Sequence, residues 1–382
     1  QAGSQIVDRI FANENVSLRA EALAFNSTIQ DLERLDHIPQ SHWYGISENH
    51  GLVHGTEAGF EEQVTGGFGQ TPENSHRVMA ENEGEVKQTL DSLYNDLSAD
   101  PSTLQYAFVF LGLGGGTGCG IASHLARKIR SYSKADMDII AIGILPNTEM
   151  FMQGESETES TSQVKQCQNV LFGLEKLEDE VEGIMLVDNQ RLAYDAAAGN
   201  EFSDYNQYVA DAFLDVVLGA EAERVDVDLE VDMQDVDLQD LIRFIEGSGS
   251  KAGYASIGRG MTMTSSILGY LLPGPVGRNS IHEASLVADA LSKQTLADTQ
   301  PSDAQSAVGV VRAPGWCWNA NEMRLGRVYE ELSYYCSDIN LGWAVTSRNI
   351  ASVTVVFGYD RADIDRLQQI ERIAKEEVAA TA

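Results

Sequence analysis

The stretch GLGGGTGCG, residues 112–120, has glycine at six of its nine positions. It directly follows the apolar run YAFVFL, residues 106–111, and residues 118–131 then place apolar side chains at helical spacing. A glycine-rich turn between a buried strand and a helix start bares backbone N–H groups and directs the helix dipole at the same point, which favours a polyphosphate. The alternative is a tight turn that only allows close helix packing.

The first half of the 382-residue chain alternates apolar runs with amphipathic segments. Residues 106–111, 138–145 and 183–187 are typical of strands buried on both faces, the pattern of a parallel sheet. Residues 118–131 and 161–177 are the helices expected between them. The alternation predicts an α/β domain with a doubly wound parallel sheet.

The second half is expected to form a smaller α+β domain. The predicted domains are 1–201 for the N-terminal α/β domain, 202–220 for a long central helix, and 221–382 for an acidic segment with the C-terminal α+β domain. In this second half the expected strands are 307–312, 341–347 and 351–358, and the expected helices are 281–295, 321–335 and 361–379.

The composition is strongly acidic, with 58 Asp+Glu against 26 Lys+Arg and a formal net charge of -32. Such a chain repels itself in dilute buffer, whereas molar salt shortens the Debye length to about 3 Å and screens the repulsion. Because only 8 of the basic residues are Lys, we favour a salt-loving host over an ordinary acidic cytosolic protein. The charge argues against nucleic acid as a partner, since duplex binding needs clustered Lys or Arg.

The cysteine pattern predicts neither a disulfide framework nor a zinc site, and a cytoplasmic location is expected. The four cysteines are scattered and form no CxxC pair: Cys119, Cys167, Cys317 and Cys336. No apolar stretch approaches about 18 residues, so neither a membrane span nor a secretory leader is expected.

Four histidines share one expected loop, where a polar surface is favoured over a metal site: His37, His42, His50 and His54.

Two familiar phosphate-binding patterns fail on counting. The dinucleotide pattern GxGxxG puts Thr117 or Cys119 where its last glycine belongs, and the P-loop pattern lacks its lysine. Residues 114–120, GGGTGCG, instead match the GGGTGxG signature of the tubulin/FtsZ superfamily, which the chain resembles most strongly from residue 1 to 260.

Two further segments are most similar to the CetZ branch of that superfamily. They are LDHIP, residues 35–39, and GYASIG, residues 253–258, and the acidic composition agrees with them. CetZ proteins are filament-forming GTPases of haloarchaea and relatives, associated with cell shape. The resemblance therefore implies GTP or GDP as ligand.

The resemblance also implies where the nucleotide binds. QAGSQ, residues 1–5, resembles the first nucleotide loop, and FGQTP, residues 68–72, the loop around the γ-phosphate. VDNQRL, residues 187–192, is similar to the strand end whose Asn reads guanine and ribose, and FSDYN, residues 202–206, to a helix start whose aromatic residue stacks on the base. The implied nucleotide-binding residues are Gln1, Ala2, Gly3, Ser4, Gln5, Asn26, Gly67, Gly69, Gly114, Gly115, Gly116, Thr117, Gly118, Glu149, Asn189, Phe202 and Asn206.

Some positions depart from the family pattern. Asn26 keeps the FtsZ-type Asn, but Thr28 stands where a carboxylate often helps to hold Mg²⁺. Mg²⁺ is therefore expected to be held mainly by phosphates and water, and no metal-ligating residues are predicted. Glu149, in the sugar-binding loop, lies one residue out of the expected spacing from Pro146.

The hydrolytic residues are implied by DVDLQD, residues 235–240, which resembles a loop that family members deliver to the nucleotide of the next subunit. Asp237 and Asp240 stand at its two acidic positions, and their i, i+3 spacing at a helix start lets both carboxylates orient a water for attack on the γ-phosphate. The alternative is that both belong to a solvated acidic run.

Because donor and acceptor loops lie at opposite ends of a family subunit, the resemblance implies self-association head to tail, which generates a filament. Three functions stay open: a self-assembling GTPase that controls cell shape, a nucleotide-binding regulator of filaments without turnover, and a division-ring FtsZ. A membrane association is expected to be indirect only.

Overall fold

The structure, a computed structural model, describes residues 2–13, 16, 20–96, 106–132, 137–148, 157–191, 202–217, 245, 251–265 and 279–380. The chain forms two compact units. Unit 1 comprises Gln1–Ala210, Glu246–Gly253 and Asp365–Ala382, and unit 2 comprises Asp211–Ile245 and Tyr254–Ile364. The C-terminal segment thus groups with unit 1, while the domain boundaries expected from the sequence stay a prediction.

Unit 1 is built on parallel strands in the order β4 (Tyr106–Gly112), β5 (Asp138–Leu145) and β6 (Gly183–Asp188). Leu111 pairs with Gly143, which in turn pairs with Leu186. All of β6 and all of β5 after its first residue are buried, as continuous apolar runs require. The predicted doubly wound α/β fold is confirmed.

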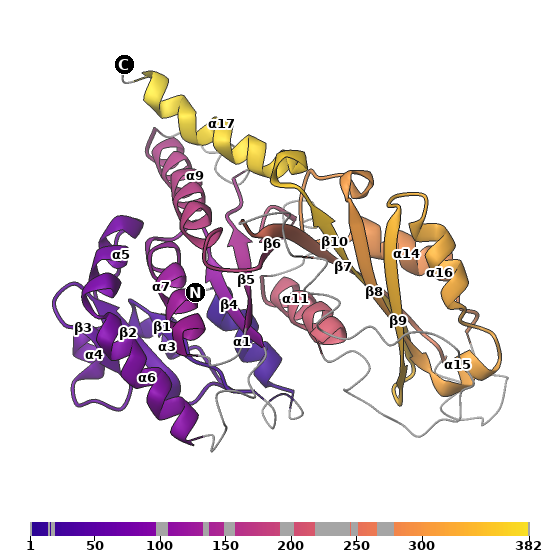
Figure 1. Ribbon diagram of the computed structural model, residues 1–382, viewed down its shortest axis with the longest axis horizontal. Coiled ribbons are helices and arrows are strands. Elements are labelled where there is room, and N and C mark those ends of the chain that lie inside the picture. Colours follow the sequence, from indigo (N-terminus) through magenta and orange to yellow (C-terminus); the bar gives the residue numbers. More distant parts are fainter. Residues whose placement is uncertain are drawn as a thin grey trace. The chain divides into compact units, whose positions relative to one another are not determined.

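Helices surround these strands, and Figure 1 shows α9 beside α17. α7 packs against β4, α5 and α9, and α1 packs against β4. The longer helices described in unit 1 are α1 (Ala2–Phe11), α5 (Pro72–Glu81), α6 (Glu83–Asp96), α7 (Gly116–Tyr132), α9 (Glu157–Leu177), the start of α11 (Phe202–Val217) and α17 (Asp365–Ala380).

A second sheet in unit 1 corrects the expectation of one loop around the histidines. β1 (Ala24–Asn26) pairs in parallel with β2 (Trp43–Ser47), which forms an antiparallel hairpin with β3 (Gly51–His54). Among the described residues, no group of three or more His, Cys, Asp or Glu is arranged to hold a metal ion. The short helical segments nearby are α3 (Ile29–Leu32), Gln40–His42 and α4 (Phe60–Gln63).

Unit 2 is the predicted α+β part. β10 (Ile350–Tyr359) pairs antiparallel with both β7 (Gly253–Met263) and β8 (Ser306–Pro314), and β9 (Asp338–Thr346) lies parallel to β8. Its remaining described helical elements are α14 (Glu283–Ser292), Pro301–Asp303, α15 (Gly315–Asn319), α16 (Leu325–Leu332) and Arg361–Asp363.

A buried carboxylate ties the end of α11 to the unit 2 sheet. Asp215, 3% exposed, accepts from Arg259 Nε at 2.7 Å, from Thr354 Oγ1 at 3.0 Å and from Arg312. Buried arginines need such partners, because an unpaired charge in the interior is very costly.

The four cysteines are all free and buried. Among the residues that the structure describes, no helix combines the length and the apolar character needed to cross a membrane.

Candidate functional site

The glycine turn lies where the sequence predicts, between the end of β4 and the start of α7. Leu113 N–H donates to Ile144 O at 2.8 Å, and the Cys119 thiol donates to Leu113 O at 2.8 Å. These bonds fix the turn at the carboxyl edge of parallel strands, which is where α/β proteins bind ligands.

Several glycines of the turn are required by packing alone. A Cβ on Gly116 would lie 2.7 Å from Thr71 N, one on Gly118 would lie 2.9 Å from Gly112 O, and one on Gly114 would lie 3.0 Å from the Pro146 side chain. Gly3 shows the same effect on α1, where a Cβ would lie 2.6 Å from Phe110 O. Close packing therefore accounts for part of the motif.

Gly115 does not fit that explanation. It is exposed, and the nearest atom to a Cβ placed on it is Gly112 O, at 4.0 Å. Packing does not require a glycine here, whereas an anion approaching the N-terminus of α7 would. The residues present thus fit a phosphate group.

A second loop faces the glycine turn. Gly67 and Gly69 have φ of 59° and 53°, the left-handed region that glycine adopts freely. Gln70 has φ of 60° without being glycine, and such local strain is concentrated at functional sites. Gly67 N–H donates to Ser27 O at 3.2 Å, so the loop is held to the end of β1.

Asn169, on α9, bonds to both loops, although it belongs to no motif that the sequence indicates. Its Nδ2 donates to Gln70 O at 3.0 Å and to Gly114 O at 3.1 Å, and its side chain is buried. One turn earlier, Lys165 Nζ lies 3.4 Å from Thr71 Oγ1. α9 therefore supplies both a clamp and a positive charge beside the loops.

The end of β1 approaches the same turn. Ser27 Oγ lies 2.6 Å from Thr117 Oγ1. Asn26 is buried, and its side chain bonds to Ser27 N at 2.8 Å and to Asp31 at 3.3 Å. Asp31 also accepts from Thr28 Oγ1 at 3.0 Å, so the carboxylate nearest to Thr28 in the sequence is already engaged by protein groups.

Asn206, expected at the base, contacts Gln5 of the first nucleotide loop, and Asn189 directly follows β6. Asn206 Nδ2 donates to Gln5 Oε1 at 3.4 Å, and Asn189 N–H donates to Leu145 O at 3.2 Å. Tyr205, beside Asn206, donates to Asp188 O at 3.2 Å. Burial, with the Asp188 charge nearby, raises the pKa of Tyr205 well above its usual value, so the phenol stays a neutral donor.

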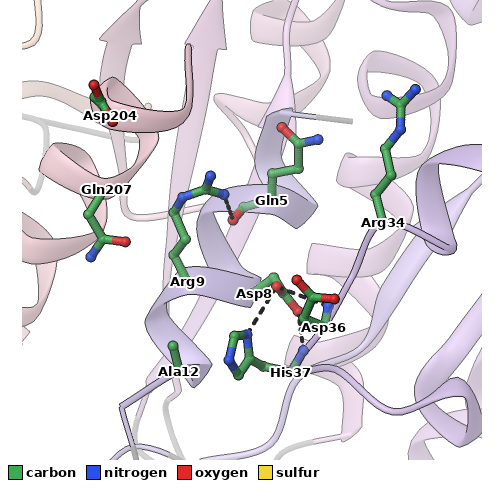
Figure 2. Close-up of a pocket in the computed structure, with 9 residues that line it drawn as sticks. All are labelled: Gln5, Asp8, Arg9, Ala12, Arg34, Asp36, His37, Asp204 and Gln207. Carbon is green, nitrogen blue, oxygen red and sulfur yellow. Dashed lines mark hydrogen bonds and ion pairs between the residues drawn. The ribbon is translucent and has the colours of Figure 1, made fainter. Parts of the chain in front are cut away.

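A cleft of about 690 Å³ borders this end of the site and shares Gln5 with it. Figure 2 shows its lower wall, where the buried Asp8 carboxylate receives the backbone N–H groups of Asp36 and His37 at 3.2 and 2.7 Å. Asp8 also accepts from Ile38 N at 3.1 Å. The LDHIP segment thus wraps a carboxylate of α1.

Some predicted residues cannot be placed. Gln1, Glu149, Asp237 and Asp240 lie outside the described residues, and of Phe202 only the backbone, at the start of α11, is described. Ala2 and Ser4 lie on the first turn of α1.

The fold and the turn define an α/β protein whose glycine turn fits a phosphate group, and comparison identifies the family. Residues 1–196 match the family model described as "Tubulin/FtsZ family, GTPase domain". The match covers more than half of the chain, and the protein belongs to the tubulin/FtsZ family.

The chain is similar to CetZ proteins of Haloferax volcanii. It is 26% identical to CetZ5 over 98% of this chain and 90% of that protein, and 27% identical to CetZ1 over 68% of this chain and 58% of that protein. The GDP-bound CetZ1 monomer matches the fold with a TM-score of 0.68 at 18% identity, covering 98% of this chain and 96% of that one. The GTPγS-bound CetZ2 protofilament matches with 0.69 at 18% identity, covering 100% and 97%.

Proposed function

We propose that this protein is a cytoskeletal GTPase that binds GTP and GDP, polymerises head to tail and hydrolyses GTP at the junction between subunits. The observation that carries the proposal is the exposed, unpacked Gly115 directly before α7, in a turn where packing requires glycine at Gly116 and Gly118. Membership of the family, and the nucleotides and protofilament named for its CetZ relatives, support guanine nucleotide and self-assembly.

In this proposal the glycine turn and the Gly67–Gln70 loop hold the phosphates, and Lys165 adds positive charge. Asn189, Asn206 and Gln5 would contact base and ribose. Mg²⁺ would be held mainly by phosphates and water, because Asp31 is engaged by Asn26 and Thr28.

Asp237 and Asp240 are proposed to orient the attacking water for a neighbouring subunit's nucleotide. We also propose a role in cell shape in the cytoplasm of a halophilic archaeon, with any membrane association indirect. The acidic composition supports the choice of host.

Phosphate release and light scattering with GTP and with ATP, measured across protein concentration in molar KCl, test this function. We expect GTP turnover per molecule to rise with protein concentration, because a complete site needs two subunits. Turnover per molecule that is independent of concentration would contradict hydrolysis at a junction.

The variant Asp240→Ala tests the catalytic assignment. It is expected to bind GTP normally, lose turnover and stabilise polymer, while Asp228→Ala, in the same acidic run, should behave like the wild type. Unchanged turnover in Asp240→Ala would reject the role of this carboxylate.

A regulator without turnover and a division-ring FtsZ remain the other candidates. Sedimentation with GTP and with GDP at high salt distinguishes a regulator from the proposed polymerising GTPase. A regulator would not pellet on its own in a GTP-dependent manner.

A further inference from the structure

Arg366, near the start of α17, is the largest fully buried side chain in the described part of the chain. It forms an ion pair with Asp188, with Nε at 2.8 Å from Oδ2, and both side chains are 0% exposed. A guanidinium with no access to water must have its charge and its donors satisfied within the protein.

The remaining contacts of Arg366 join two segments that follow different strands. Nη2 donates to Pro146 O at 2.8 Å and Nη1 donates to Thr148 Oγ1 at 2.9 Å, in the segment after β5, while Asp188 ends β6. Nη1 also bonds to Gln369, one turn further along α17.

The two segments are then bonded to each other. Thr148 Oγ1 donates to Gln190 Oε1 at 2.9 Å, and Gln190 N–H donates to Asp188 Oδ1 at 3.0 Å. Asn189 lies between Asp188 and Gln190, and Tyr205, the residue before Asn206, donates its hydroxyl to Asp188 O at 3.2 Å. The network therefore includes the residues on both sides of Asn189 and the residue before Asn206, the two Asn residues proposed to contact the base.

We propose that Arg366 is a positioning residue for the nucleotide base, through which α17 sets the affinity and selectivity for guanine. The inference rests on the proposed function, since it needs a guanine nucleotide beside Asn189 and Asn206. The planar guanidinium of Arg366 reaches four partners in fixed directions, which the single ammonium of Lys cannot reproduce.

The test compares GDP with inosine diphosphate, which lacks only the 2-amino group of guanine. Dissociation constants are measured on full-length chain in molar KCl for the wild type, Arg366→Lys and the control Arg372→Lys, which changes an exposed Arg on the same helix. We expect Arg366→Lys to weaken GDP binding by about tenfold and to reduce the preference for GDP over inosine diphosphate. The control should keep both values.

A second variant guards against simple unfolding. Asp188→Asn with Arg366→Met removes both charges, so no lone charge stays buried, and thermal unfolding reports whether it folds. We expect it to fold and to show the same loss of preference.

An unchanged preference in the folded variants would overturn the inference, as would an equal loss for both nucleotides, because a purely structural role lowers both alike. If the wild type bound no guanine nucleotide, the proposed function would fail and the inference with it. If the wild type preferred GDP and the variants kept that preference, only the inference would fail.

Discussion

The glycines of β7 in unit 2 serve close packing alone, whereas those of the glycine turn in unit 1 differ from one another. On β7, a Cβ on Gly258 would lie 2.1 Å from Ala290 O, and one on Gly260 would lie 2.0 Å from Leu286 O, both on α14. These glycines let a helix approach a strand. In the turn before α7, Gly116 has the same purpose, whereas Gly115 faces open space. A glycine-rich motif is thus evidence for a ligand only at the positions that packing leaves unexplained.

The largest effect is expected at the β7 contact. Gly260→Ala should lower the free energy of unfolding by roughly 3 kcal/mol, because a methyl group cannot share space with the Leu286 carbonyl. Chemical unfolding in molar KCl measures it. Gly326→Ala is the control, since that glycine is exposed with no atom within 4 Å of its Cβ position. A loss at Gly260 no larger than the control would contradict the packing explanation.

A smaller loss is expected at Gly116, but with two consequences. Gly116→Ala should cost about 1–3 kcal/mol of stability by pushing against Thr71 N, and it should also weaken GDP binding by displacing the second loop. Unfolding and nucleotide titration on the same preparation measure both. Normal GDP affinity in a destabilised Gly116→Ala protein would separate this loop from the nucleotide site.

Gly115 should show the reverse pattern. Gly115→Ala is expected to leave stability within about 0.5 kcal/mol. It should weaken GDP and GTP binding by about tenfold, or roughly 1.4 kcal/mol, since the methyl group would occupy the approach of the phosphate. The matched control is Gly84→Ala, an exposed helical glycine with open space around it. Full affinity in Gly115→Ala would remove the main support for the phosphate site.

The smallest effect is expected on the pH dependence of stability and concerns His124 and Glu83. His124, on α7, accepts from His76 at 3.0 Å through Nε2 and donates to Glu83 at 3.1 Å through Nδ1, with Arg127 and Lys128 also near that carboxylate. Burial lowers the pKa of His124, and the hydrogen bond from Lys128 lowers the pKa of Glu83.

As the pH falls, His124 is therefore protonated in the unfolded chain before it is protonated in the folded protein. The free energy of unfolding accordingly decreases as the pH drops below about 6.5. Unfolding midpoints of His124→Gln between pH 7.5 and 5 should fall less than those of the wild type. Glu83 loses its stabilising charge only at lower pH, as its own folded-state pKa is crossed. His50→Gln, which changes an exposed His, should follow the wild type, and an equally steep fall in His124→Gln would contradict the assignment.

The sequence predicted the central strands and the glycine turn well, because strands buried on both faces are continuous apolar runs with clear limits. β5 has the predicted bounds, and β4 and β6 each extend one residue further. The β1, β2 and β3 sheet was missed since its strands are three to five residues long and contain Gly, Ser and His.

The site could be predicted where a local motif carried it, and not where distant residues complete it. Asn169 is 55 positions from Gly114, and Arg366 is 220 positions from Pro146. Neither belongs to a recognisable pattern, because each acts by reaching backbone carbonyls that only the fold brings near. The nucleotide contacts themselves stay predictions.

The four buried cysteines can report local unfolding of each unit. Cys119 and Cys167 belong to unit 1, and Cys317 and Cys336 belong to unit 2. Burial raises the pKa of the Cys119 and Cys336 thiols, so little thiolate is available in the native state. An alkylating reagent would therefore label each unit only as that unit opens. The order in which the four cysteine-containing peptides are alkylated as the salt concentration is lowered would show which unit of this acidic protein unfolds first.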